Sequence, residues 1–288
     1  MFLYYLHNSH LQIDLKPSLF VLENVVGILT HNKGNTLKEL IKAFEEIDYK
    51  IDWRILNAAN YGVPQKRERF ILIGTDRVND IKFPQPSHFF EGKSIGYKDN
   101  SRMLKSTEEL CSAITVLEAI SDLPEIKSGE KSAVYKSSPL NSYQKSRRDK
   151  TKILTLHEAS NHSPKMLEII KHSGDNISSI PNHLITSGFS SCYSRMRPNE
   201  PANTITVKFR SPSSSKCIHP FQNRSITIRE AARLQGFKDD FKFAGSSTDI
   251  SALIGNAVPS PLGYAIANSA IYILEKQKSL KNKSIVNV

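Results

Sequence analysis

The sequence predicts an α/β fold. Short apolar runs typical of strands surround a segment of helical periodicity in the first 80 residues, and helical patterns return near the end of the chain. The 288 residues have a hydrophobic content of 39%, which is enough for a sizeable core. Between residues 81 and 210 the periodicity weakens and Ser, Lys, Asn and Pro accumulate. Helical periodicity returns from about residue 225, so the sequence divides into an ordered start, a weakly periodic middle and an ordered end.

The elements of the first 80 residues follow the order strand, helix, strand, strand. Their expected bounds are Phe2–Ile13 for an amphipathic segment, Leu19–Leu22 for a strand, 35–49 for a helix, and 51–55 and 70–73 for two further strands. Asn35 or Thr36 would cap the helix, whose apolar residues form one stripe. Glu23 falls where the first strand ends, and in open α/β sheets ligands bind at the carboxyl ends of strands.

Capping and stop signals in the last 64 residues predict two helices. Thr227 followed by Glu230 is a capping box, and Gly236 is a suitable stop for the helix that it starts. A loop is expected next, and then a final helix that Ser260 would cap, with one face of apolar and small residues.

The charge balance favours a polyanionic partner. Lys and Arg number 39 against 28 acidic residues, which gives a net charge of +11 and a pI near 9.4. Residues 127–152 alone carry eight basic side chains and two acidic ones. Any one of these lysines fits a solvated loop, whereas together they could contact phosphates.

The cysteines point to a reducing compartment. Cys111, Cys192 and Cys217 lie far apart and form no CxxC pair, so they predict neither a metal site nor a disulfide framework. No apolar run has the length needed to cross a bilayer, and the first residues lack the features of a signal peptide. We therefore expect a cytoplasmic protein without a membrane partner.

The stretch YGVPQKRERFILIG places three polar side chains at alternate positions before an apolar strand. In extended backbone Gln65, Arg67 and Arg69 would share one face and form a polar row. Such a row could be the solvated start of a strand. It could also present two guanidinium groups and an amide to carbonyl and phosphate oxygens.

Five segments resemble successive signature motifs of the DNA (cytosine-5) methyltransferases and stand in that family's order: FVLENVVGIL, NAANYGVPQKRERFILIG, RMRPNEPANTIT, HPFQNRSITIREAARLQGFKDDF and IGNAVPSPLGYAIA. The resemblance implies a Rossmann-like, S-adenosylmethionine-dependent methyltransferase sheet, present in part, with an inserted target recognition domain over 81–224. Residues 1–80 would be the C-terminal part of the catalytic domain, and 225–288 its closing helices. The implied reaction is methyl transfer to carbon 5 of a cytosine flipped out of double-stranded DNA, in a restriction–modification system.

The resemblance also implies site residues. Glu23 would hydrogen-bond N3 and the exocyclic amine of the cytosine, Arg69 would bind its O2, and Arg67 would hold the flipped nucleotide and its phosphate. The implied DNA-binding residues are Gln65, Arg195, Arg197, Thr204 and Thr206, and the implied cofactor contacts are Asn256 and Val258. From the residues alone, Thr204 and Thr206 could simply lie on one face of a strand, and Gly255 and Asn256 could form a tight turn.

Two family motifs have no counterpart: the Gly-rich cofactor loop and the Pro-Cys pair that delivers the nucleophile. None of the three cysteines follows a proline, so no nucleophile is predicted in this chain. We expect either one part of a split enzyme completed by a separate N-terminal polypeptide, a remnant of a broken gene, or a non-catalytic DNA-binding protein. An RNA methyltransferase fits the long basic middle less well. Without the missing strands the chain alone should be poorly stable and inactive.

Overall fold

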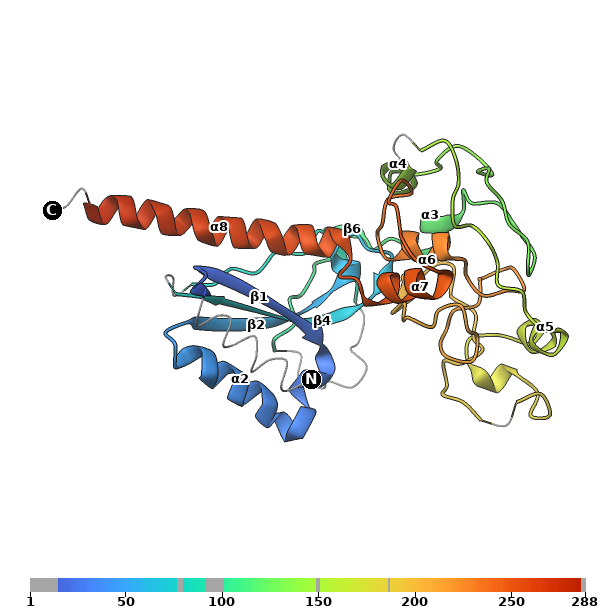
Figure 1. Cartoon of the computed structure of the whole chain (residues 1–288), viewed down its shortest axis with the longest axis horizontal. Coiled ribbons are helices and arrows are strands. Elements are labelled where there is room, and N and C mark those ends of the chain that lie inside the picture. The colour runs from blue at the N-terminus through green and yellow to red at the C-terminus, as the bar shows by residue number, and fades with distance from the viewer. Residues whose placement is uncertain (1–14, 77–79, 92–100, 149–150, 186, 286–288) are drawn as a thin grey trace. The chain divides into compact units, whose positions relative to one another are not determined.

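A computed structural model describes residues 15–76, 80–91, 101–148, 151–185 and 187–285, with side chains to residue 276. The predicted segment Phe2–Ile13 lies outside these residues. The chain forms two compact units, each built from separate stretches (Figure 1). Unit 1 contains the residues up to Tyr61, Glu68–Leu110 and the residues from Gly263, and unit 2 contains Gly62–Arg67 and Cys111–Leu262. The domain boundaries expected at 80/81 and 224/225 fall inside these units.

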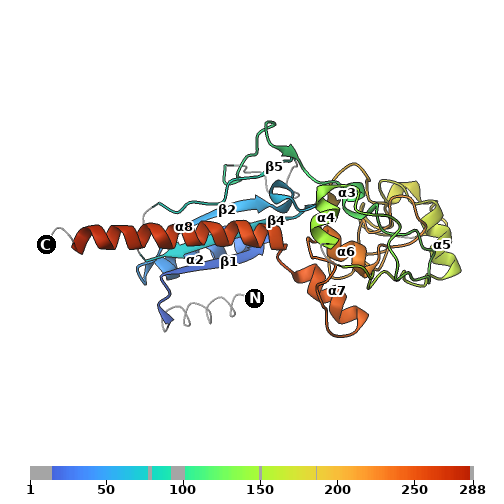
Figure 2. The same ribbon diagram turned by 90° about the horizontal axis from the view of Figure 1, so that it is seen from above.

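Unit 1 is an antiparallel sheet between helices. The strands β1 (Leu19–Val25), β2 (Lys50–Asn57) and β4 (Glu68–Thr75) stand in the order β1-β4-β2, so the α/β class is confirmed. Helix α2 (Asn35–Glu45) packs on one face, where Phe44 meets Phe20 and Leu72 in the core. The long helix α8 (Ser260–Ile285) runs along the opposite face (Figures 1 and 2).

The start of α2 differs from the prediction. Its N-cap is Gly34, at φ +86°, and no side chain caps the first turn. A left-handed backbone at this position suits glycine. Neither Asn35 nor Thr36 is therefore the cap, and the Thr36 hydroxyl instead shares a 2.7 Å hydrogen bond with His31 Nδ1.

Helix α8 buries the predicted face in unit 1, with Ile266, Ser269 and Ile273 inside. Ser260 does not cap it, because its hydroxyl donates to the Gly236 carbonyl at 3.0 Å. Among the described residues no single helix is long and apolar enough to cross a membrane, although the bent pair of α7 (Ser247–Asn256) and α8 meets that criterion by length and composition.

Unit 2 has short helices around one core. Among the described residues, unit 1 also contains η1 (Val26–Leu29), η2 (His31–Gly34), η3 (Ala58–Tyr61) and β5 (His88–Phe89). The short elements of unit 2 are β3 (Gln65–Lys66), β6 (Cys111–Ser112), α3 (Val116–Ile120), α4 (Ser142–Arg148), α5 (Pro164–Lys171), η4 (Ile177–Ser179), β7 (Ala202–Asn203) and α6 (Ile228–Leu234). Strand β3 pairs in parallel with β7. The core gathers α3, α6 and α7 with the segment around Ile205 and Phe209.

The capping box of α6 is confirmed. The Thr227 hydroxyl accepts from the Glu230 backbone nitrogen, while the Glu230 carboxylate accepts from the Thr227 nitrogen at 2.7 Å. Gly236 follows the helix at φ +89°, as a helix stop requires. The prediction of a loop before the last helix is wrong, because this segment forms α7, which begins with a capping box between Ser246 and Asp249.

Candidate functional site

An ion pair joins the ends of two neighbouring strands in unit 1. The Glu23 carboxylate lies 2.8 Å from Arg69 Nε, and the two side chains are 30% and 11% exposed. The register sets Glu23 opposite Ile71 and Val25 opposite Arg69, so both charged side chains project from the same face of the sheet.

The guanidinium of Arg69 is held from two sides. Besides Glu23, it contacts the Glu68 carbonyl, to which Nη1 donates at 2.8 Å. Burial lowers the pKa of Arg69, and the nearby Glu23 carboxylate opposes that shift. The pair therefore presents an acidic and a basic hydrogen-bonding group side by side at one edge of the sheet.

Gln65 lies in the interior of unit 2 and is completely buried. Its amide nitrogen donates to the Leu234 carbonyl at 3.2 Å and to the Gln235 side chain, and its oxygen accepts from the Ile205 backbone nitrogen at 2.9 Å. Gln235 in turn donates to the Ile254 carbonyl at 2.9 Å. Gln65 thus ties α6, α7 and the segment after β7 together.

Arg67 is also buried, with 2% of its surface exposed. It donates to the Ile205 carbonyl at 3.2 Å and to the Gly255 carbonyl at 3.0 Å. The predicted polar row is therefore wrong. The backbone leaves the strand between β3 and β4, so that Gln65 and Arg67 lie in unit 2 whereas Arg69 lies in unit 1.

Gly255 allows a close approach of two segments in unit 2. A Cβ on this residue would lie 2.6 Å from the Thr206 carbonyl carbon. The predicted tight turn at Gly255 and Asn256 is instead the last turn of α7, and a glycine is needed there because backbone packs against backbone. Asn256 and Val258, the predicted cofactor contacts, are both exposed at this helix end.

The four predicted DNA-binding residues of the middle segment have different environments. Arg195 donates to four backbone carbonyls, of Ser173, Ile170, His219 and Gln222, and burial lowers its pKa. Arg197 is half exposed and pairs with Asp175 at 3.1 Å and Glu200 at 2.8 Å. Thr204 donates to the Lys66 carbonyl at 2.9 Å, and Thr206 is exposed.

Sequence reasoning missed a buried charge network in unit 2. Arg224 and Glu230 form a two-pronged pair at 2.8 and 2.7 Å with both side chains fully buried. Arg233 binds Asp239 at 2.6 Å and Asp122 at 3.0 Å. The arginines at five- and four-residue spacing around α6 (Arg224, Arg229 and Arg233), each near an acid, were the available signal.

The described cysteines differ in exposure. Cys217 is buried, and burial raises the pKa of its thiol to about 12, whereas Cys111 is exposed. A thiol with a raised pKa is a poor nucleophile at neutral pH. No group of three or more potential metal ligands occurs among the described residues.

Residues 10–271 match the C-5 cytosine-specific DNA methylase family. The chain is 35% identical to the type II methyltransferase M1.HphI of Haemophilus parahaemolyticus, over 89% of this chain and 57% of that protein. It is 31% identical to M.DdeI of Desulfomicrobium norvegicum, over 93% and 66% of the two chains. An E. coli prophage-encoded protein described as a DNA modification methyltransferase shares the fold, with a TM-score of 0.67 and 22% identity over 95% of this chain and 74% of the solved chain.

The chain therefore belongs to the C-5 cytosine-specific DNA methylase family, whose members use S-adenosylmethionine as methyl donor. Type II methyltransferases of bacterial restriction–modification systems are among its relatives. The chain spans about 57–66% of the length of these bacterial relatives.

Proposed function

We propose that this chain holds the target cytosine and reads the DNA sequence in a cytosine-5 methyltransferase of a restriction–modification system. The Glu23–Arg69 pair supports this assignment above all, because a carboxyl group and a guanidinium at 2.8 Å match the amine, ring nitrogen and carbonyl on the edge of cytosine. Because the chain belongs to the C-5 cytosine-specific DNA methylase family, we assign DNA as its substrate and S-adenosylmethionine as the methyl donor.

Each side chain of the pair has a chemical role in this proposal. The Glu23 carboxyl group accepts from the exocyclic amine and shares a proton with N3, while Arg69 donates to O2. Both interactions strengthen as a nucleophile adds to carbon 6 and negative charge develops on the ring. Arg67 acts from the interior, where it positions the backbone that leads into Arg69.

The cofactor contact that we assign to this chain is small. The exposed amide of Asn256 and the exposed apolar side chain of Val258 fit the polar and apolar edges of an adenosine-containing ligand. S-adenosylmethionine supplies the methyl group when it is bound. The Gly-rich loop and the nucleophilic thiolate come, in this proposal, from a polypeptide segment other than these 288 residues, since none of the three cysteines follows a proline and Cys192 and Cys217 are buried.

We assign residues 81–224 to target recognition, because the basic middle of the chain and the exposed Arg197 and Thr206 suit contacts to DNA. The competing function is a non-catalytic DNA-binding protein derived from such an enzyme. The Glu23–Arg69 pair argues against it, since a protein that only binds a duplex has no use for a cytosine-binding pair.

The test is methyl transfer in a reconstituted enzyme. The chain is co-expressed either with the polypeptide encoded directly upstream or with an N-terminal family segment that carries a Gly-rich loop and a Pro-Cys pair. Tritium transfer from S-adenosyl-[methyl-³H]methionine to DNA is measured, and bisulfite sequencing locates the modified base. We expect no transfer by the chain alone and cytosine methylation by the complex.

Variants of the pair complete the experiment. Glu23→Gln and Arg69→Lys should each lower the rate of the complex by about 100-fold or more. Glu39→Gln, an exposed carboxylate on α2, is the matched control and should leave the rate unchanged. Wild-type activity in Glu23→Gln would refute the proposal, and DNA binding without any methylation by the complex would favour the non-catalytic alternative.

A further inference from the structure

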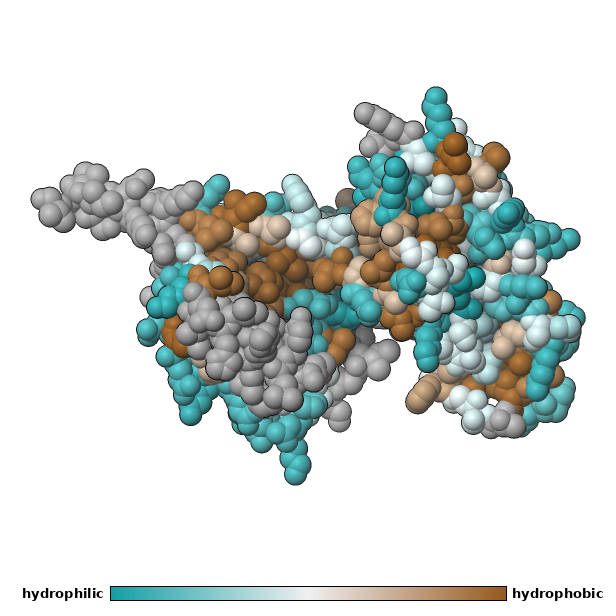
Figure 3. Space-filling view, viewed as in Figure 1, coloured by the Kyte–Doolittle hydropathy of each residue, from teal (hydrophilic) through white to brown (hydrophobic). Residues whose placement is uncertain are grey.

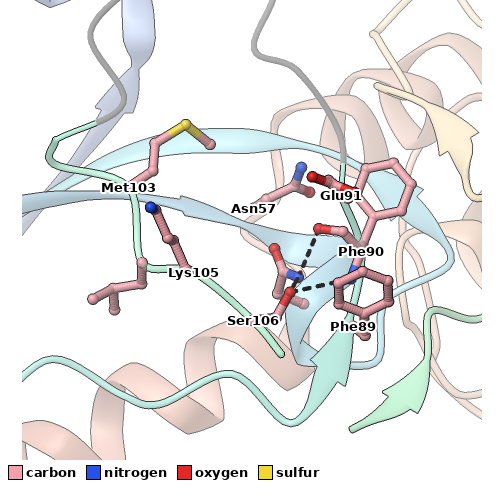
Figure 4. A pocket seen from close by; sticks show the side chains of 9 residues that line it. Asn57, Phe89, Phe90, Glu91, Met103, Lys105 and Ser106 are labelled. Atoms are coloured by element: carbon pink, nitrogen blue, oxygen red, sulfur yellow. Dashed lines mark hydrogen bonds between the residues drawn. The ribbon is translucent and has the colours of Figure 1, made fainter. Parts of the chain in front are cut away.

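A pocket of about 260 Å³ lies in unit 1, where β2 ends, and neither Glu23 nor Arg69 lines it. Figure 4 shows its side chains, which come from β2, from β5 and the residues after it, and from the segment around residue 105. The lining residues that matter here are Asn57, Phe89, Phe90, Glu91, Lys105 and Ser106.

The walls of this pocket are fixed by one buried side chain. Asn60 donates to the carbonyls of His88 and Phe90, both at 3.2 Å, and to the Ser106 hydroxyl oxygen at 2.8 Å. The same hydroxyl oxygen accepts from the Phe90 backbone nitrogen at 3.2 Å. Because these bonds all join groups of the protein itself, they hold the pocket walls in place and little ordering is needed when a ligand binds.

Asn57 provides a buried hydrogen-bonding group inside the pocket. Its side chain is 5% exposed, and its oxygen accepts from the Ala59 backbone nitrogen at 3.1 Å. Within the part of the chain that the structure describes, the amide NH₂ has no protein partner, and Figure 4 shows it in the pocket with the Glu91 carboxylate. An amide NH₂ donates to ring nitrogens and carbonyls, while a carboxylate accepts from amino and imino groups.

This combination of groups is the one that a nucleobase needs. Phe89 and Phe90 offer aromatic rings for stacking, which is tolerant of base identity. Asn57 and Glu91 offer a donor and an acceptor for the edge of a base, and Lys105 offers a cation for a phosphate. A closed apolar cavity would lack the last three groups.

The pocket is close to the candidate cytosine pair along the sheet. Leu56 pairs with Arg69 and Asn57 pairs with Glu68, so Asn57 lies one residue beyond the partner of Arg69, at the same end of the sheet, and its side chain projects from the opposite face. Neighbouring strands lie about 4.8 Å apart. A DNA strand that delivers a cytosine to Glu23 and Arg69 would reach this pocket by passing around this end of the sheet.

We propose that the pocket binds a second, unpaired nucleobase of the DNA strand that carries the target cytosine, an inference that rests on the proposed function. Such a site would hold the strand open next to the flipped base and add to the choice of sequence. Unstacked bases that are stacked on aromatic side chains are a general means of binding single-stranded DNA.

The test measures binding by the full chain, without methyl transfer. The probes are a short single-stranded oligodeoxynucleotide, a duplex with one extrahelical 2-aminopurine, and the same duplex fully paired. Phe90→Ala is expected to weaken binding of the first two probes about tenfold, and of the paired duplex by much less. Stacking should also quench the 2-aminopurine fluorescence in the wild type, and less so in Phe90→Ala.

Two further variants keep the outcome interpretable. Lys105→Ala should weaken single-strand binding and reduce its salt dependence. Tyr272→Ala removes an exposed aromatic of unit 1 that lies outside this pocket, and it should bind all probes like the wild type. Circular dichroism confirms that each variant is folded.

The results separate this inference from the proposed function. Failure of the chain to bind any DNA would count against the proposed function itself. Equal weakening of all three probes by Phe90→Ala, or none, would overturn the nucleobase pocket while leaving the cytosine pair untouched. Competition by S-adenosylhomocysteine for the 2-aminopurine signal would also overturn it, in favour of the adenine of the cofactor.

Discussion

Replacing Glu230 by Gln should destabilise unit 2, because it breaks a buried ion pair. Both carboxylate oxygens of Glu230 accept from Arg224, at 2.7 and 2.8 Å, and one also accepts from the Thr227 backbone nitrogen at 2.7 Å. A glutamine amide keeps one of these acceptors and turns the other into a donor. In either orientation a donor then faces an Arg224 N–H, and the arginine loses its countercharge inside the core.

Removing one partner of a buried pair costs about 3–5 kcal/mol, since the remaining charge is left without compensation. Protonation of Glu230 has the same effect. Burial acts to raise the pKa of this carboxyl group, but Arg224 outweighs burial, and the net pKa is well below its usual value. The stabilisation is thus complete above the unfolded pKa of about 4.3 and is lost as the pH falls below it.

Urea unfolding of the full chain at neutral pH, followed by circular dichroism, measures the effect. Glu168→Gln is the matched control, because its carboxylate pairs with Lys171 at 2.8 Å on the exposed surface of α5. Exposed pairs contribute little, so this control should unfold like the wild type. The reasoning is refuted if Glu230→Gln shifts the midpoint no more than Glu168→Gln does.

Three further outcomes follow from buried groups and close contacts. Burial lowers the pKa of His219 to about 4, so between about pH 4 and 6.5 the unfolded chain binds more protons than the folded chain does. The free energy of unfolding of the wild type should therefore decrease as the pH falls from 6.5 towards 4, and the urea midpoint of His219→Gln should fall less steeply over the same range. Gly255→Ala should lower the unfolding free energy by about 1–3 kcal/mol; Gly27→Ala, where a Cβ meets nothing closer than 3.9 Å, should not. A thiol reagent at pH 7 should label exposed Cys111 in native protein and reach Cys217 only after unfolding; equal labelling rates would contradict its burial.

The elements that sequence predicted well are those with local signals. The strands β1, β2 and β4 follow from apolar runs within a few residues, and the capping box of α6 lies within four residues. Helix α7 was missed although Ser246 and Asp249 form a readable capping box. Its apolar and small residues show weak periodicity, and a pattern of this kind does not distinguish a helix from a loop.

The candidate site was predictable only in part. The ion pair of Glu23 and Arg69 joins neighbouring strands, and both residues are predicted from motifs that resemble those of the family. The burial of Gln65 and Arg67 could not be predicted, because their partners lie 138–188 residues away in the sequence. Alternation alone cannot tell a continuous strand from one that breaks at its third residue.

The position of Gln65 in the chain has a consequence for folding during synthesis. The ribosome makes this residue 140 residues before Ile205 and 170 residues before Gln235, its partners in unit 2. Until those partners emerge, a polar side chain destined for the interior and the backbone on both sides of it remain in solvent. Unit 2 therefore cannot be completed while the chain is partly made, and contacts between distant residues slow folding. The incomplete nascent chain would be a substrate for chaperones, and a stalled ribosome would release an incompletely folded, aggregation-prone fragment.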